Sequence, residues 1–175
     1  MQIKTIFLDR DGVINLDLNY LSKINDFKFI DGVFDACNHF IKLGYKIVIV
    51  TNQSGIARGY FSNHDFKILT RWMLLEFESR QIDILDIFYC PHAPNDNCSC
   101  RKPMPGMFLE AQKKYNIDMK NSWIIGDKEE DIIAANNSGI KNTIIVKSGH
   151  KVNENSTKAK FILNSIYNSI QVIIN

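Results

Sequence analysis

The sequence has no apolar run that approaches the length of a membrane span, and its first residues, MQIKTIFLDRDG, lack the apolar core and cleavage site of an export signal. We therefore expect a cytoplasmic protein without a membrane anchor. The formal net charge is only +2, which is too small to indicate binding to nucleic acid or to an anionic membrane. Repeats, low-complexity segments and linkers are also lacking, so residues 1–175 are expected to form a single domain.

Cysteine is scarce, with four residues in the chain. Cytoplasmic thiols stay reduced, so metal binding, packing or catalysis must account for these residues in place of disulfides. Cys37 lies on the apolar face of a helix expected from Val33 onward, together with Ala36 and Phe40 at helical spacing. We therefore expect Cys37 to pack in the core.

The other cysteines gather in one short segment. Cys90, His92, Cys98 and Cys100 lie within eleven residues, around prolines and an Asn-Asp-Asn turn. Three thiolates and one imidazole complete the closed tetrahedron of a structural zinc site, which leaves no open position for catalysis. The alternative is a set of reduced thiols beside an unrelated histidine. The pattern predicts Zn²⁺ in a loop, 90–100, that has almost no apolar residues to hold it in place.

Short apolar runs alternate with helical patterns along the chain. The expected strands are 6–8, 46–50, 86–90, 123–125, 142–146 and a short 161–163. The expected helices are one from Val33 with Asp31 as its cap and Gly44 at its end, one opened by Ser62 with Asp65 three residues on, 106–115, 130–138, and a terminal helix from about Asn164. This alternation predicts an α/β fold, a single Rossmann-like three-layer domain with a mainly parallel sheet and helices on both faces.

Two acidic residues, Asp9 and Asp11, follow the first expected strand as the chain leaves the sheet. Open α/β sheets bind ligands at this edge. Neighbouring acids repel each other unless a proton or a cation lies between them, so the pair indicates a divalent metal with oxygen ligands, magnesium above all. The alternative is an ordinary Asp-Gly turn. A calcium loop is excluded because Gly12 comes too early and no glutamate occupies the closing position.

Polar residues also follow the later strands. Thr51 follows the second strand, Arg101 and Lys102 follow the third strand and its cysteine loop, and Asp127 follows the fourth. Each has an ordinary interpretation as a turn residue or a solvated charge. Because the carboxyl ends of parallel strands meet at one edge of a sheet, however, we expect these residues to converge with Asp9 on one site.

Four motifs, taken in chain order, resemble those of the haloacid dehalogenase phosphatase superfamily. They are Asp9-Arg10-Asp11, Thr51, Lys102, and Gly126-Asp127 with Asp131. Longer stretches resemble the D-glycero-D-manno-heptose 1,7-bisphosphate 7-phosphatase family, in the zinc-containing branch that also holds the histidinol-phosphate phosphatases. These stretches are DRDGVIN, VTNQSGIARG, CPH with CSCRKPMPGM, and GDKEED. Ser54 with 56–59, and 105–107, favour the heptose enzymes, whereas Asn19 stands where those enzymes usually carry glycine.

The resemblance implies a phosphomonoester hydrolase that removes the 7-phosphate of the heptose bisphosphate through an aspartyl-phosphate, in the synthesis of nucleotide-activated heptose for lipopolysaccharide or capsule. It implies Asp9 as the nucleophile and Asp11 as the proton donor and then acceptor, so we expect the pKa of Asp11 near the working pH. Thr51 and Lys102 would bind the transferring phosphoryl group. Asp9, Asp127 and the main-chain carbonyl of Asp11 would hold Mg²⁺.

The resemblance also implies residues that contact the substrate. Arg101 matches a position that helps to recognise it, where a guanidinium suits the second phosphate. The other matching positions are Asp17, Leu18, Asn19, Tyr20, Asn52, Gln53, Ser54 and Lys128. Asp131 would orient a metal-bound water or a neighbouring side chain. The family lacks a large cap domain, so the zinc loop would form a partial wall over the site, and we expect a monomer that binds a small sugar bisphosphate.

Three other interpretations stay open at this point. The chain could be a histidinol-phosphate phosphatase or another small phosphomonoesterase. A phospho-accepting receiver domain has the same fold class, but its phosphoacceptor usually ends the third strand, where this chain has Cys90 and no aspartate. A zinc-dependent binding module leaves Asp9, Asp11 and Asp127 unexplained. Within the heptose family, either anomer at C1, and hence either the ADP- or the GDP-heptose route, fits the motifs.

Overall fold

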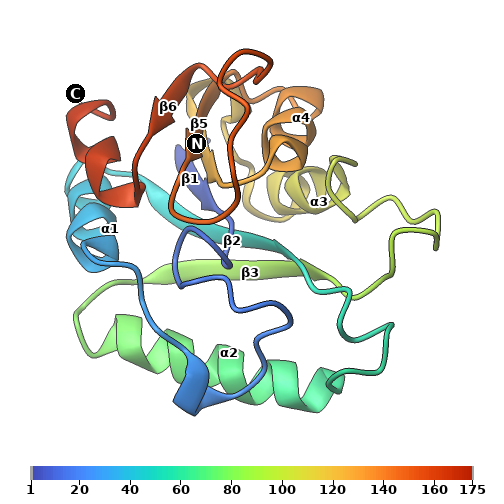
Figure 1. Cartoon of the computed structure of the whole chain (residues 1–175). Coiled ribbons are helices and arrows are strands. Elements are labelled where there is room, and N and C mark those ends of the chain that lie inside the picture. Colours follow the sequence, from blue (N-terminus) through green and yellow to red (C-terminus); the bar gives the residue numbers. More distant parts are fainter. Residues whose placement is uncertain (1, 175) are drawn as a thin grey trace.

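The computed structural model describes residues 2–174, whose strands form one six-stranded parallel sheet. The strands are β1 (Thr5–Leu8), β2 (Lys46–Asn52), β3 (Ile84–Cys90), β4 (Trp123–Gly126), β5 (Asn142–Val146) and β6 (Phe161–Leu163). Their spatial order is β3-β2-β1-β4-β5-β6 (Figure 1). The order reverses at β1 and β4, so the crevice in which open α/β sheets bind ligands lies at the carboxyl ends of these two strands.

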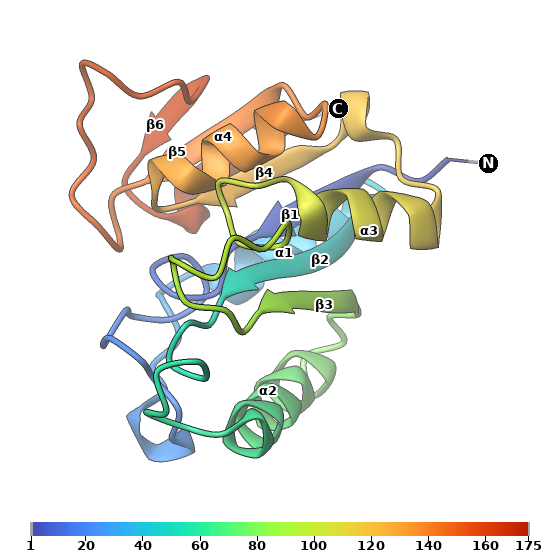
Figure 2. The ribbon, with the colours of Figure 1, turned by 90° about the vertical axis from the view of Figure 1, so that its right-hand side faces the viewer.

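Helices cover both faces of the sheet, as expected for three layers. One face carries α1 (Val33–Lys42) and α2 (Asn63–Glu78), and the other carries α3 (Gly106–Tyr115) and α4 (Glu129–Asn137). In Figure 2, α3 and α4 lie in front of the strands, α1 lies behind them, and α2 lies beyond the edge strand β3. Successive residues of a strand point to opposite faces. In β1, Ile6 and Leu8 therefore join the core under α1 and α2, while Phe7 packs on Phe108 of α3 at 5.0 Å between ring centroids.

The helix α2 begins as its sequence predicts. The Asp65 main-chain N–H donates to Ser62 Oγ at 3.1 Å, and the Ser62 N–H donates back to Asp65 Oδ2 at 2.8 Å. This reciprocal pair satisfies two donors that a helix start otherwise leaves free.

The starts of two other helical segments differ from expectation. Asp31 does not cap α1; the cap is Gly32, whose φ of 79° lies in the left-handed region and which has no capping side chain. The ring of Tyr167 packs where a side chain on Gly32 would be, so glycine is required there. The expected terminal helix is a 3₁₀ helix, Ile166–Gln171, which begins two residues after Asn164 and buries Ile166 in the core. Further 3₁₀ turns span Ile24–Asp26 and Met119–Asn121.

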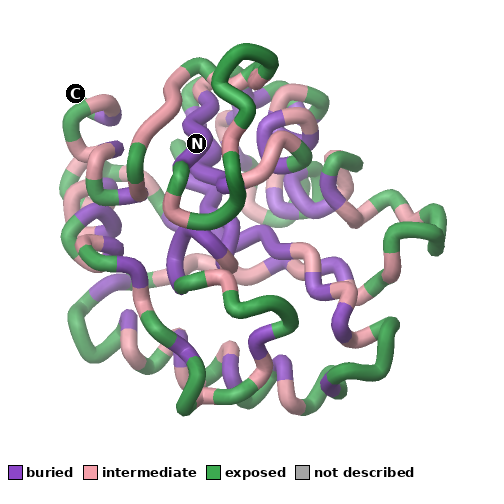
Figure 3. Tube along the Cα trace, viewed as in Figure 1, coloured by how far each residue is buried: buried purple, intermediate pink, exposed green. Residues whose placement is uncertain are grey.

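Burial is concentrated in the strands and the inner helix faces (Figure 3). All four residues of β1 are buried, in agreement with a strand covered on both sides. By contrast, the segment 91–97 after β3 is exposed or half-buried throughout. None of the helices among residues 2–174 is both long and apolar enough to cross a membrane.

Candidate active site

Two acids of the site, Asp9 and Asp127, follow neighbouring strands of the sheet. β1 pairs with β4 in parallel, with Leu8 beside Ile125, and Asp9 and Asp127 follow these strands directly. The Asp9 main-chain N–H donates to the Ile125 carbonyl at 3.0 Å, so the sheet ladder extends to the first acid. Asp9 and Asp127 are 6% and 1% exposed. The two carboxylates therefore lie side by side in a nearly dry environment, at the reversal of strand order.

A buried lysine neutralises part of this charge. Lys102 Nζ lies 2.9 Å from Asp9 Oδ1 and 2.6 Å from Asp131 Oδ1, and it donates to the Val50 carbonyl at 2.8 Å. Burial alone would lower the pKa of Lys102, but Asp131 and Asp9 outweigh it and raise that pKa. Burial raises the pKa of Asp9 well above its usual range, with Asp131 and Asp127 adding to the shift and Lys102 opposing it. One ammonium group is thus shared among several acids that repel each other.

The main chain that carries Lys102 is fixed from a neighbouring strand. Asn52, the last residue of β2, accepts from the Lys102 N–H at 3.0 Å and donates from Nδ2 to the Lys102 carbonyl at 3.1 Å. This two-way bond spans fifty residues of sequence. Asn52 therefore places the connection between β3 and α3 over the end of β2, although it also lines the cavity described below.

Asp11 is held by several donors. Arg10 Nη2 donates to both of its carboxylate oxygens at 2.9 Å, Asn15 Nδ2 donates to Oδ1 at 3.0 Å and Gln53 Nε2 donates to Oδ2 at 3.0 Å. Burial would raise the pKa of Asp11, but Arg10 and these hydrogen bonds outweigh burial and hold the pKa below its usual value. The expectation of a pKa near the working pH is therefore wrong for the unliganded protein. Gln53 Nε2 also donates to Thr51 Oγ1 at 2.9 Å, which joins Asp11 to the hydroxyl at the end of β2.

Asp127 has one oxygen that is fully bonded and one that is not. Its Oδ2 accepts from the main-chain N–H of His150 at 3.0 Å and lies 2.7 Å from His150 Nδ1. Its Oδ1 is buried without a hydrogen-bond partner among the described residues. Gly12 and Gly149 both pack against this carboxylate so closely that a Cβ on either would collide with it. The carboxylate is therefore fixed, with one oxygen left to bind something else.

The acids fit a magnesium ion. One carboxylate oxygen from each of Asp9, Asp127 and Asp131 lies within 4.8 Å of the others. Mg²⁺ prefers oxygen ligands and usually binds through one or two carboxylates together with phosphate and water. Burial and the neighbouring acids raise the pKa values of Asp9 and Asp127, and a cation beside Asp127 Oδ1 would offset both effects and satisfy the orphaned oxygen. The donor set therefore agrees with the predicted metal.

A cavity of about 220 Å³ opens above these groups. Most of the residues predicted to contact substrate line it, together with the catalytic candidates Asp9, Asp11, Thr51 and Lys102: they are Asp17, Asn19, Tyr20, Asn52, Gln53, Ser54, Arg101 and Lys128. Leu18 does not line it and is 48% exposed. Four further lining residues were not among the predicted substrate contacts: Gly55, Arg58 and Glu130, which belong to the quoted motifs, and His150, which belongs to none; Asp131 lies beside them.

The backbone conformation of the loop explains why asparagine can occupy position 19. Asn19 and Tyr20 have φ values of 54° and 55°, in the left-handed region. Glycine enters this region freely, and asparagine tolerates it better than most other residues. The Asn19 N–H donates to Asp17 Oδ1 at 2.9 Å, which tightens the turn. Asparagine in place of the usual glycine thus preserves the turn, and Tyr20 stands against Tyr60 at 4.6 Å between ring centroids.

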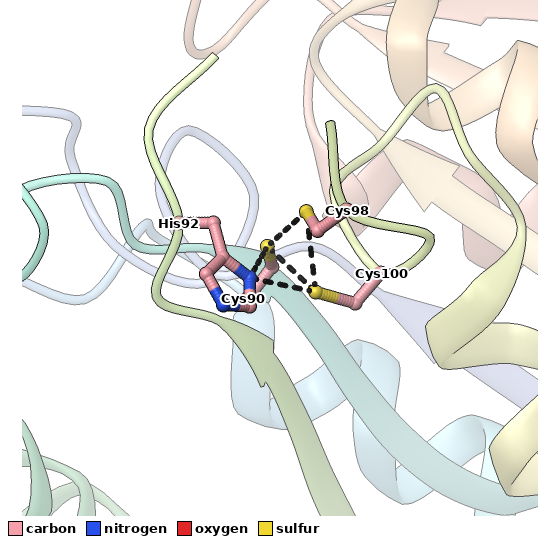
Figure 4. A group of neighbouring side chains, drawn as sticks. All are labelled: Cys90, His92, Cys98 and Cys100. Carbon is pink, nitrogen blue, oxygen red and sulfur yellow. Dashed lines mark hydrogen bonds between the residues drawn. The ribbon is translucent and has the colours of Figure 1, made fainter. Parts of the chain in front are cut away.

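The cysteines and histidine predicted to bind zinc converge on one point (Figure 4). The Sγ atom of Cys90 lies 2.9 Å from Cys100 Sγ and 3.5 Å from Cys98 Sγ, and His92 Nδ1 lies 3.2 Å from Cys100 Sγ. A tetrahedron with Zn–S bonds of about 2.3 Å has S–S edges of roughly 3.8 Å, so the four groups need to spread only slightly to hold the ion. All of the cysteines are free.

The thiols differ in their readiness to bind a metal. Burial opposes ionisation of Cys98, but hydrogen bonds from the Arg101 main chain and from the neighbouring thiols outweigh it and lower its pKa to about 7. Burial and the bond with Cys100 raise the pKa of Cys90 instead. The loop also reaches the cavity, because Arg101 Nη1 donates to the His92 carbonyl at 3.4 Å and Arg101 lines the cavity wall.

Comparisons with known proteins agree with this geometry. The HAD-hydrolase-like family profile matches residues 99–170. A D-glycero-beta-D-manno-heptose-1,7-bisphosphate 7-phosphatase from Pasteurella multocida is 47% identical over 170 residues, covering 93% of this chain and 92% of its own. A D-glycero-alpha-D-manno-heptose-1,7-bisphosphate 7-phosphatase from Photorhabdus laumondii is 44% identical over 179 residues, covering 98% and 97%.

A solved structure extends the likeness to three dimensions. The D,D-heptose 1,7-bisphosphate phosphatase from B. bronchiseptica, complexed with magnesium and phosphate, superimposes with a TM-score of 0.86 at 29% identity, covering 97% of each chain.

Proposed function

The chain belongs to the D-glycero-D-manno-heptose-1,7-bisphosphate 7-phosphatases of the haloacid dehalogenase superfamily, and from that premise we propose that it removes the 7-phosphate of D-glycero-D-manno-heptose 1,7-bisphosphate with the help of Mg²⁺. A phosphomonoester hydrolase follows from the family itself. The observation that carries the finer proposal is the buried Asp9–Lys102–Asp131 arrangement beside the orphaned oxygen of Asp127.

Asp9 is the proposed nucleophile. Its carboxylate attacks phosphorus, the bond between phosphorus and the C7 oxygen breaks, and an aspartyl-phosphate forms; water then cleaves that intermediate and releases phosphate. Lys102, 2.9 Å from Asp9, and Thr51 hold the non-bridging oxygens of the transferring group. Burial of these groups supports the proposal, because hydrogen bonds and charges act more strongly where water is excluded.

Asp11 is the proposed proton carrier. It donates a proton to the departing C7 oxygen and later takes one from the attacking water. The bonds from Arg10, Asn15 and Gln53 favour the carboxylate in the unliganded protein, so the base role is ready before substrate binds. The dianionic phosphate of the substrate opposes that charge and favours protonation for the acid role.

Asp9, Asp127 and the main-chain carbonyl of Asp11 would hold Mg²⁺. When bound, the ion offsets the repulsion between the phosphate dianion and the carboxylates, which is on the order of 4 kcal/mol for a pair of unit charges at 4 Å and an effective dielectric near 20. Asp131 positions Lys102, from which its Oδ1 lies 2.6 Å away.

Arg101 and the loop from Asp17 to Tyr20 hold the rest of the sugar bisphosphate. Arg101 is the proposed partner of the phosphate at C1, because a guanidinium can bind two phosphate oxygens at once. Zn²⁺ on the cysteine loop has a structural role, since its four protein ligands leave no open position. The free thiols fit a cytoplasmic protein, where the product would serve the synthesis of nucleotide-activated heptose.

A substrate panel tests the proposal. We would measure phosphate release from both C1 anomers of the heptose bisphosphate, from histidinol phosphate and from p-nitrophenyl phosphate, with and without Mg²⁺. We expect kcat/KM for one heptose anomer to exceed that for histidinol phosphate by at least about 100-fold, in the range that buried polar contacts give. Equal or faster cleavage of histidinol phosphate would contradict the proposed heptose substrate. Turnover that does not depend on Mg²⁺ would contradict the proposed metal requirement.

A further inference from the structure

His150 lies in the loop after β5, outside every motif that pointed to the site, yet it touches the most buried acid of the site. Its main-chain N–H and its ring Nδ1 both reach Asp127 Oδ2, at 3.0 and 2.7 Å. A ring nitrogen 2.7 Å from a carboxylate oxygen carries the proton of that hydrogen bond, so Nδ1–H is the donor. The ring therefore binds Asp127 as a hydrogen-bond donor.

The consequence falls on the other oxygen of Asp127. With Oδ2 bound twice by one residue, the carboxylate cannot turn without breaking both bonds. The glycines at 12 and 149 close the remaining space around it. Oδ1 is left buried and without a partner among the described residues. A carboxylate fixed in this way has its free oxygen aimed before any cation arrives.

We propose that His150 is a positioning residue for the metal site: its Nδ1–H fixes Asp127 so that Oδ1 is presented to Mg²⁺. This inference deepens the proposed function and rests on its magnesium site. Groups that hydrogen-bond a metal's carboxylate ligand commonly change metal affinity by about 10- to 100-fold when they are removed. His150 belongs to that class: it lines the cavity, and none of its described bonds reaches Lys102.

A second cation is the competing interpretation. Asp17, Asp127 and His150 each offer an atom within 4.8 Å of the others, and His150 Nδ1 lies 3.5 Å from Asp17 Oδ2. A nitrogen that donates to Asp127 cannot at the same time bind a metal, and Mg²⁺ selects oxygen over imidazole. The hydrogen bond therefore favours the positioning role.

Calorimetric titration of Mg²⁺ into the zinc-loaded protein, without substrate, tests the proposal. His150→Ala removes the ring donor, whereas His150→Asn can place an amide N–H near the position of Nδ1. The His150 side chain is 45% exposed, so both variants are expected to fold. We expect the Kd for Mg²⁺ to rise about tenfold or more in His150→Ala and to stay within about threefold of wild type in His150→Asn. Lys151→Ala, an exposed neighbour, serves as the matched control and should leave Kd unchanged.

The outcomes separate this inference from the proposed function. An unchanged Kd in His150→Ala overturns the positioning role, as does equal weakening in both His150 variants. Two bound cations in the wild type, one of them lost in His150→Ala, would mean that the ring is a ligand. Asp127→Asn should abolish Mg²⁺ binding; if it does not, the magnesium site of the proposed function fails, whatever His150 does.

Discussion

The carboxylate–lysine cluster at β1 and β4 and the cysteine–histidine cluster after β3 lie at the same edge of the sheet, but they are held in place by different means. The acids Asp9, Asp127 and Asp131 are buried, follow strands or begin a helix, and have Lys102 and His150 as partners. Cys90 ends β3, whereas His92, Cys98 and Cys100 come from the stretch without helix or strand between β3 and α3, and the bonds of these four residues run chiefly to one another.

The difference concerns what a bound metal would contribute to each cluster. The carboxylate cluster is ordered by protein charges, so an ion would add chemistry to a site that already exists. The 91–97 segment of the cysteine loop is exposed or half-buried, so an ion would supply order there. Loss of a residue from the first cluster should therefore remove activity and spare the fold, whereas loss from the second should loosen a segment and affect activity indirectly.

The largest expected effect comes from Asp9→Asn. We expect kcat to fall by a factor on the order of 10⁴ or more, because an amide cannot form the acyl phosphate. The melting temperature should stay close to that of wild type, since asparagine has nearly the same shape and Lys102 retains Asp131. Steady-state phosphate release and calorimetry measure the two quantities. Turnover close to wild type would show that the covalent route is wrong.

Asp11→Asn should give the next largest loss and sharpen the roles within the carboxylate cluster. We expect kcat on the heptose bisphosphate to fall by about 10² to 10⁴, in the range of lost acid–base catalysis. The loss on p-nitrophenyl phosphate should be at least about tenfold smaller, because p-nitrophenolate leaves without a proton. Asp35→Asn, at an exposed carboxylate of α1, is the control. Equal losses on both substrates would leave Asp11 only its role as a base.

Removal of zinc should affect local order first. Cys98→Ala, or chelation, should abolish binding of one Zn²⁺ per chain and increase hydrogen exchange in the 91–101 segment. We expect kcat/KM to fall by about 10-fold, through loss of the hydrogen bond from Arg101 to the loop, an effect in the range of one bond to a charged group. Cys37→Ala, which removes a buried cysteine from the core, should leave zinc bound.

Lowering the pH should also release zinc and loosen the 91–101 segment, without any mutation. Thiolates bind the ion, so protons compete with Zn²⁺ for the cysteines, and zinc affinity should weaken as the pH falls. If the zinc-free protein kept full activity and the 91–101 segment stayed protected from hydrogen exchange, the contrast between the two clusters would be wrong.

Arg101→Ala connects the two clusters, and its expected effect is confined to KM. We expect KM for the bisphosphate to rise about 10-fold or more, while KM for a monophosphate changes only a few-fold, because a bond to a charged group contributes about 1.5–3 kcal/mol. Arg101→Lys should recover part of the loss, since lysine retains the charge without the paired donors. Arg71→Ala, at an exposed position of α2, is the control. Equal changes for both substrates would argue against a role at the second phosphate.

Much of the fold could be predicted because the sequence patterns and the packing agree. Apolar runs that end in polar residues predicted six strands, and the Ser62–Asp65 pair predicted the start of α2. Asp31 was wrong as a cap because the tertiary packing of Tyr167 selects Gly32. The terminal helix was predicted without its 3₁₀ type, since a short apolar segment does not reveal which hydrogen-bond pattern the packing will impose.

The candidate site could be predicted only as far as its motifs extended. Asp9, Lys102 and Asp127 converge because strand ends of a parallel sheet meet at one edge, which follows from topology alone. His150 was missed because it comes four residues after β5, in a loop whose path no local pattern determines. Its signal, in retrospect, was position: the residues after β5 continue to the same edge as those after β4.

The pairing of Lys102 with both Asp9 and Asp131 has a consequence for the proposed cycle, in which Asp9 becomes an acyl phosphate. Formation of the acyl phosphate would remove the negative charge from the Asp9 carboxylate that Lys102 contacts, and the remaining anionic oxygens would belong to a phosphoryl group that leaves in each turnover. Asp131 remains 2.6 Å away and does not react, so the cation keeps a counter-ion at every stage. Lys102 can therefore stay buried and charged while the phosphoryl group passes from the substrate to Asp9 and is then released as inorganic phosphate.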